Sequence, residues 1–240
     1  MKATRLPCHL MALFLVLAQP FVSSERAHAA EPAEPQEVLQ AFLKADSVDK
    51  LLPLVADRDA IEEEIRAYYK NGVRKAIVAQ DVECVSRGLI PGTRLEVCLY
   101  MVRAGRNRIP VSVEQTKAGY KVDWKSFTQF HDRSLEKFFD DSESAGGEFL
   151  VQLRRSHCFG NDIPDLGELI CFRVQSPIAP FLHASVFVRK GSEEAKGMLE
   201  QFRWSQDYRP VVEMKWVKPA PGNGAARIEL VRVVRSKWRG

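Results

Sequence analysis

The acidic and imidazole groups that could carry acid–base chemistry are few, and two of them lie in one short stretch. Asp123 stands directly before Trp124, and His131 follows downstream. Burial beside aromatic rings would raise the pKa of the Asp123 carboxyl and turn it into a proton acceptor. The same aspartate is placed to cap the helix that follows it, with Trp124 filling the core. We favour the capping role, and we keep Asp123 and His131 as the candidate catalytic residues.

Other catalytic signatures are missing from the sequence. Beyond the first 29 residues the histidines are His131, His157 and His183, and no His-Glu-x-x-His, Cys-x-x-Cys or calcium-loop spacing is present. His157 and Cys158 are neighbours on a predicted strand, so their side chains point to opposite faces and cannot form a nucleophile–base pair there. We therefore predict no metal, no cofactor and no evident catalytic constellation.

Basic and aromatic residues are interleaved in the second half of the chain. Such a mixture suits a face that binds single strands or sugars, because cations attract anionic groups and rings stack on flat ones. Strand alternation places Phe187 and Arg189 on one face, opposite to Val186 and Val188, which predicts that the two are exposed together. We take four residues as ligand-binding candidates: Arg173, Phe187, Arg189 and Lys190.

Four cysteines follow the first 29 residues, and each close pair brackets a stretch of turn residues. In an exported chain this spacing favours the disulfides Cys84–Cys98 and Cys158–Cys171. Four free, partly buried thiols are the alternative, because sparse cysteines on strands are often small core residues. The sequence leaves both possibilities open.

The chain begins with the features of a secretory signal peptide, which we assign to residues 1–29. Lys2 and Arg5 form a positive region, residues 10–18 are continuously apolar, and Ala27-His28-Ala29 has the small-x-small pattern of a cleavage site. The apolar stretch is shorter than the roughly 20 residues that span a bilayer, so a retained anchor is the weaker interpretation. We predict cleavage near Ala29, a mature chain without a transmembrane segment, and a location in the periplasm or outside the cell.

Composition and charge exclude several classes of protein. Of the 240 residues, 45% are apolar, which is too many for an intrinsically disordered chain. Removing residues 1–29 takes away three of the 35 basic and one of the 31 acidic residues, leaving 32 and 30. A nearly balanced mature chain has no overall field that would steer it toward nucleic acid, so we expect no nucleic-acid partner.

The patterns along the mature chain predict two modules. Residues 30–35 form an extended tether, and residues 36–142 begin with three helices whose apolar residues repeat on one face. Four short strands follow, joined by tight turns, at 76–86, 94–104, 108–116 and 120–124. A stretch rich in Asp, Ser and Gly at 140–147 is typical of a linker.

The second module, residues 148–240, has a different order of elements. Three predicted strands precede a helix that Ser192 caps, and two more strands follow it, at 148–159, 168–175, 183–190, 211–218 and 227–235. One helix between the third and fourth of five strands is the order of a small closed barrel of the oligonucleotide/oligosaccharide-binding (OB) type, over residues 148–238. The predicted fold class is α+β: three helices and a bent antiparallel four-stranded sheet, followed by a five-stranded OB-like barrel.

The first module resembles the nuclear transport factor two-like, or SnoaL-like, fold, a cone in which helices pack on the concave face of a bent sheet. The resemblance covers about residues 36–140 and rests on the helical runs 38–43 and 61–69 and on Tyr120-Lys121-Val122-Asp123-Trp124. The whole chain is also similar to exported bacterial proteins of unassigned function, which share residues seen here as Ser192, Ala195, Leu199 and Trp238. These resemblances imply two linked modules.

These observations favour binding or structural association over catalysis. We predict an exported soluble binding or structural protein, whose partner is an envelope protein, a glycan or a small apolar ligand. The alternative is a small-molecule enzyme that uses the cone pocket of the first module, with Asp123 and His131 as acid and base. A cone filled by Phe and Tyr side chains would favour the structural interpretation, whereas a deep cavity lined by a carboxylate would favour the enzyme.

Overall fold

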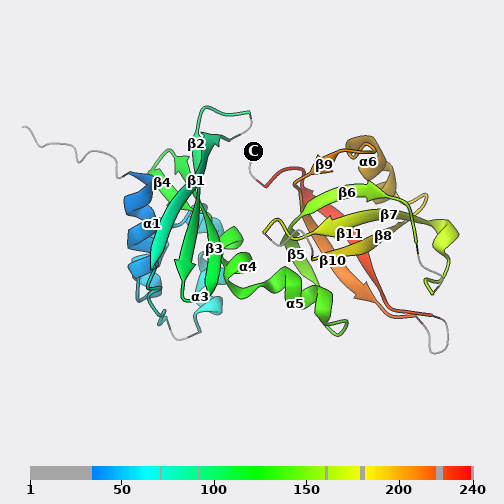
Figure 1. Cartoon of the computed structure of the whole chain (residues 1–240), viewed down its shortest axis with the longest axis horizontal. Coiled ribbons are helices and arrows are strands. Elements are labelled where there is room, and N and C mark those ends of the chain that lie inside the picture. The colour runs from blue at the N-terminus through cyan, green and yellow to red at the C-terminus, as the bar shows by residue number, and fades with distance from the viewer. Residues whose placement is uncertain are drawn as a thin grey trace, which may run out of the picture. The chain divides into compact units, whose positions relative to one another are not determined.

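The computed structural model describes residues 34–70, 72–90, 92–159, 162–178, 182–219 and 224–238. The predicted signal peptide and most of the tether lie outside these residues. The described chain forms helices and two β-sheets, which confirms the α+β class (Figure 1). No helix among these residues is both long enough and apolar enough to cross a bilayer.

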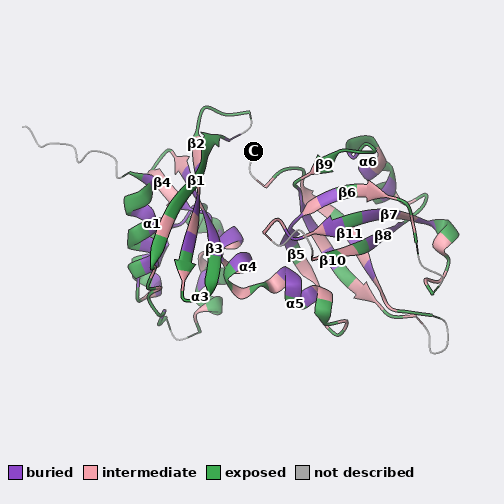
Figure 2. Ribbon diagram, in the orientation of Figure 1, coloured by how far each residue is buried: buried purple, intermediate pink, exposed green. Residues whose placement is uncertain are grey.

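The first sheet is a four-stranded antiparallel meander, as predicted. Its strands pair in the order β1-β2-β3-β4. Gly105 in the turn after β2 and Gly119 at the start of β4 have φ values of 61° and 89°, which glycine adopts without strain. Figure 2 shows that β1 is exposed along most of its length. The strands are β1 (Asp81–Leu89), β2 (Glu96–Ala104), β3 (Asn107–Thr116) and β4 (Gly119–Val122).

Helices pack against this sheet, and aromatic rings fill the space between. Phe42, Trp124 and Phe127 are buried there, and the rings of Phe42 and Phe127 meet edge to face with centroids 4.9 Å apart. Apolar side chains of β2 and β3 complete this core. Side chains therefore fill the space between these helices and the first sheet. The helices are α1 (Pro35–Lys44), α2 (Val48–Leu51), the 3-10 turn Leu52–Leu54, α3 (Arg58–Tyr68) and α4 (Trp124–Asp132).

The second sheet has seven strands and is mixed, where five strands were predicted. Its order is β5-β10-β11-β8-β7-β6-β9, with β8 and β11 parallel and the other neighbours antiparallel. The predicted strand at 148–159 is interrupted at Val151, and its two parts pair with different strands. The strands are β5 (Gly147–Leu150), β6 (Gln152–Ser156), β7 (Leu169–Gln175), β8 (His183–Arg189), β9 (Asp207–Tyr208), β10 (Val211–Val217) and β11 (Arg227–Arg235).

A second core lies between this sheet and two helices, α5 (Ser134–Asp140) and α6 (Glu193–Gln201). As predicted, Ser192 caps α6, because its hydroxyl oxygen accepts the N–H of Ala195 at 3.1 Å. One face of α6 then buries Ala195 and Met198 against the sheet. Both the cap of α6 and its buried face therefore follow from residues that the sequence analysis had identified.

Side chains from distant segments form hydrogen bonds to the backbone where the strand is interrupted between β5 and β6. The Gln129 side-chain amide donates to the carbonyl of Leu150 and accepts from the N–H of Leu150, both at 2.8 Å. Trp238 donates its indole N–H to the carbonyl of Val151 at 3.3 Å, and its ring lies 6.4 Å from that of Phe130. Buried backbone groups next to Val151 are thus satisfied by side chains from distant segments.

Candidate functional site

Asp123 and His131 lie at opposite ends of α4. The Asp123 carboxylate is buried and accepts the N–H of Ser126 at 3.3 Å, which makes it the N-cap of the helix. His131 lies in the last turn, where its ring stacks on Phe127 with centroids 5.3 Å apart. Eight residues of helix separate the two by about 12 Å along the axis, too far for a shared proton. The capping role predicted for Asp123 is confirmed.

Substituting Asp123 separates its capping role from a catalytic one. We expect Asp123→Ala to lower the free energy of unfolding by about 1 kcal/mol, because an N–H at the start of α4 loses its acceptor. Asp123→Asn should keep nearly full stability, since asparagine caps helices as well as aspartate does. Chemical denaturation of both variants measures the difference. Equal losses in the two variants would contradict the cap and point to a need for the charge.

The structure assembles a hydrogen-bonded group that the sequence did not indicate. Tyr68, from α3, donates its hydroxyl to Asp132 Oδ2 at 2.7 Å, and His131 Nδ1 lies 2.8 Å from Asp132 Oδ1. Burial, and then the hydrogen bond to Asp132, raise the pKa of Tyr68 above its usual value. Tyr68 therefore remains protonated at neutral pH and serves as a hydrogen-bond donor to Asp132.

One of the two predicted disulfides is present. Cys158 is bonded to Cys171, while Cys84 and Cys98 are free thiols. Across the β1–β2 pair, Cys84 lies opposite Tyr100 and Cys98 lies opposite Arg87, with a bulge between. Cys98 points into the core, where burial raises the pKa of its thiol, and Cys84 is exposed. The predicted Cys84–Cys98 pair is wrong because the register places the two residues apart.

The four ligand-binding candidates do not form one exposed group. Arg173 and Arg189 are exposed, but Phe187 is only 4% exposed, so its predicted exposure beside Arg189 is wrong. The segment between β6 and β7 covers Phe187 and packs Ile163 and Leu166 into a small cluster with it. Lys190 donates its ammonium group to the carbonyl of Gly167 in the same segment. Alternation placed Phe187 on the correct face, and a distant segment then covered that face.

A hollow of about 450 Å³ lies where this segment meets β8 and the start of β11. The segment between β6 and β7 touches the one between β10 and β11, because the N–H of Ala225 donates to the carbonyl of Asp162 at 2.9 Å. Gly224 has φ +103°, and a Cβ there would lie 2.4 Å from the same carbonyl oxygen, so this approach requires glycine. Four aromatic side chains line the hollow: Phe139, Phe159, Phe187 and Trp216.

Polar groups of both kinds also line this hollow. Donors come from Arg227 and His183, acceptors come from Asp140 and Asp162, and the Ser185 hydroxyl can do both. Arg227 Nε is buried and has no hydrogen-bond partner among the described residues. An unsatisfied buried donor costs stability, so this guanidinium is held in the wall of the hollow at some expense to the fold. The sequence did not indicate this site, because its lining comes from five separate segments.

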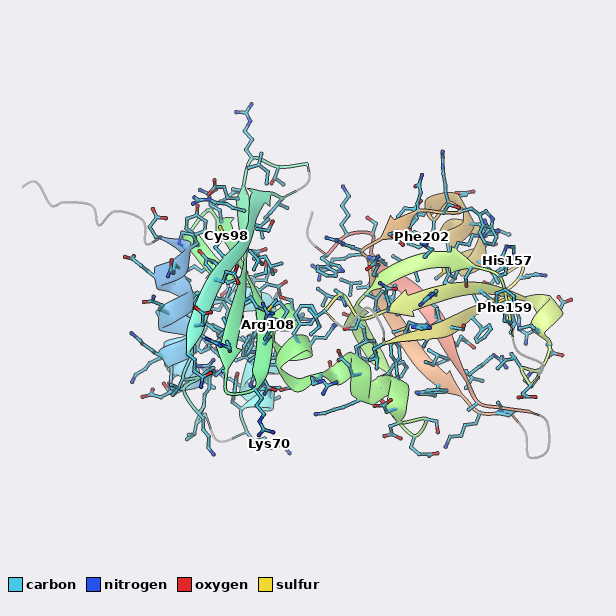
Figure 3. All side chains as sticks on the ribbon, in the orientation of Figure 1. Lys70, Cys98, Arg108, His157, Phe159 and Phe202 are labelled. Atoms are coloured by element: carbon cyan, nitrogen blue, oxygen red, sulfur yellow. A yellow bond between two sulfur atoms is a disulfide. The ribbon has the colours of Figure 1, made fainter. Side chains whose placement is uncertain are left out.

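A row of aromatic and basic side chains leads away from the hollow, and we call it the aromatic row. The guanidinium of Arg155 lies 4.5 Å from the ring centroid of Trp204, and the Trp204 ring lies 4.9 Å from His157. The His157 ring is in turn 6.3 Å from Phe159, which also lines the hollow. Figure 3 labels His157 and Phe159 at the same end of the second sheet.

A scan against models of known protein families, a search of curated proteins and a search of solved structures each found no match to this chain. Within the described ranges, no group of three or more His, Cys, Asp or Glu side chains could hold a metal ion.

Proposed function

We propose that this protein is an exported binding protein that holds a carbohydrate in the hollow beside β8. The observation that carries the proposal is the lining of the hollow, where aromatic rings stand beside both donors and acceptors. Sugar hydroxyls donate and accept hydrogen bonds at the same time, and the apolar faces of pyranose rings pack on aromatic side chains. A concave site with many rings and a few converging polar groups matches that chemistry.

The alternative ligands fit the hollow less well. Phosphates would be repelled by the carboxylates of Asp140 and Asp162, whereas single-strand sites combine rings with a positive groove. A purely apolar ligand would cover the polar side chains of Asp140, Ser185 and Arg227 without offering them hydrogen bonds. A neutral molecule rich in hydroxyl groups satisfies both kinds of polar group.

The strand order supports an OB-like closed barrel as the scaffold of this site. β5 and β6 together make one strand interrupted at Val151, which pairs with β10 on one side and β7 on the other. Counting them as one strand closes the ring in the order β6-β7-β8-β11-β10-β5, with α6 before the fourth strand. In OB-folds the connections after the first and fourth strands flank the ligand, and here both line the hollow. Export itself is inferred from the leader in residues 1–29.

Binding can be measured through the tryptophan in the hollow. We would titrate the purified protein with maltotriose, cellotriose and chitotriose and follow intrinsic fluorescence, because Trp216 lines the site. We expect at least one trisaccharide to bind with a millimolar or lower Kd. Arg227→Ala should raise that Kd at least about tenfold, because the hollow loses the charged side chain in its lining.

A matched control is Arg108→Ala, which removes an exposed arginine from the first sheet and should leave the Kd unchanged. Circular dichroism of each variant establishes that it is folded. The proposal is wrong if none of the three sugars produces a saturable change, or if Arg227→Ala binds as tightly as the parent protein.

A further inference from the structure

Two large aromatic side chains of the aromatic row are exposed to solvent. Phe159 is 78% exposed and Trp204 is 44% exposed, and both belong to the same row. Single exposed apolar side chains are ordinary, but large rings that gather on one surface mark a site of contact. The Trp204 ring is already held between Arg155 and His157, so it would lose little freedom on binding.

Resting on the carbohydrate function proposed above, we propose that the aromatic row is a second subsite, and that the ligand is an acidic oligosaccharide. One sugar occupies the hollow, the chain passes Phe159, and a carboxylate-bearing sugar lies on the row with its carboxylate at Arg155. Phe159 joins the two subsites, because it lines the hollow and is the last ring of the row.

Arg155 supplies the argument for a carboxylate. Its Nε is buried and has no hydrogen-bond partner among the described residues, and none of them forms an ion pair with it. The neighbouring Arg154, by contrast, is held by Asp207 through two hydrogen bonds of 2.7 and 2.8 Å. The guanidinium of Arg155 instead lies beside the exposed ring of Trp204, where its charge attracts the carboxylate of a sugar that packs on that ring.

The charges of the two subsites differ in sign. The hollow contains the carboxylates of Asp140 and Asp162, which disfavour a second negative charge. The row contains Arg155, and the exposed Arg203 stands directly before Trp204 in the chain. This difference gives the ligand a direction: its neutral part lies in the hollow and its acidic part lies on the row.

The test compares two trisaccharides that differ in the charge of one terminal sugar. The probe 3′-sialyllactose, which has a neutral lactose unit and one carboxylate-bearing sugar at its end, and its methyl ester are titrated into the purified protein at low salt, with tryptophan fluorescence as the readout. We expect the acid to bind about tenfold more tightly than the ester, as one charge-assisted contact predicts. The preference should shrink in high salt, because a partly exposed ion pair is screened.

Variants in the aromatic row test whether Arg155 causes the preference for the acidic trisaccharide. Arg155→Gln should remove the preference for the acid and leave the affinity for the ester unchanged, and Arg155→Lys should restore part of the preference. Trp204→Phe keeps a ring with a weaker attraction for cations, so both probes should bind slightly less tightly. Arg108→Gln, in the first sheet, should change neither Kd.

The outcomes separate this inference from the carbohydrate function. Equal affinities for acid and ester in the parent protein, or an unchanged preference in Arg155→Gln, would overturn the acidic subsite while binding in the hollow stands. If the neutral trisaccharides bind and 3′-sialyllactose does not, the acidic ligand is wrong. If no saccharide binds at all, the carbohydrate function itself fails.

Discussion

Replacing Phe202 by alanine is expected to lower the free energy of unfolding by about 3–5 kcal/mol, the usual loss for a buried phenylalanine ring. Phe202 follows α6 and is 0% exposed. Its ring meets those of Phe172 and Tyr208 with centroids 6.1 and 4.9 Å apart. Because these rings come from separate segments, no single side-chain movement can fill the cavity that alanine leaves. Urea denaturation followed by circular dichroism measures the loss.

The same substitution at an exposed site provides the control. Phe159→Ala removes an identical side chain that is 78% exposed, and it should change the free energy of unfolding by no more than about 0.5 kcal/mol. Both residues are labelled in Figure 3. Similar losses in the two variants would contradict the position of Phe202 in the second core.

Replacing both Cys158 and Cys171 by serine is expected to cost about 3 kcal/mol. The disulfide joins residues 13 apart in the chain, and closing a loop of that length restricts the unfolded chain by about this amount. The bond also anchors the segment between β6 and β7, which lines the hollow through Phe159 and Ile163. We therefore expect the double variant to bind saccharides more weakly even at temperatures where it stays folded.

Cys84→Ser is the matched control, because Cys84 is an exposed free thiol. It should unfold at the same urea concentration as the parent protein, and adding a reductant should lower the stability of the parent and of Cys84→Ser alike. A reductant that leaves the parent unchanged would show that the bond adds no stability. Alkylation in denaturant without reductant, read by mass spectrometry, should label the thiols of Cys84 and Cys98 and spare Cys158 and Cys171.

The elements that the sequence predicted correctly depend on nearby residues. The meander of the first sheet follows from short apolar strands separated by glycine turns, and Asp123 caps α4 through an N–H three residues away. Ser192 caps α6 in the same way. Turn chemistry and capping act over a few residues, so a linear pattern contains the information that they need.

The errors arise where a distant segment covers or divides a predicted element. Phe187 lies on the predicted face but is covered by residues 163–166 from the preceding connection. The predicted strand at 148–159 is divided at Val151, where the side chains of Gln129 and Trp238 bind its backbone. A local sequence pattern cannot predict these contacts, because the contacting residues are tens of residues away in the chain.

The sequence by itself determined the α+β class, the antiparallel order of the first sheet and the residues that cap two helices. Those features rest on periodicity and on hydrogen bonds between near neighbours. The tertiary structure alone decided which cysteines pair, and it alone brought Tyr68 to Asp132 and Trp204 to Arg155. It also built the hollow from five segments of the second sheet and its surroundings. Such contacts depend on strand register and on the pairing of segments that are far apart in the sequence. Neither can be read from any single stretch of residues.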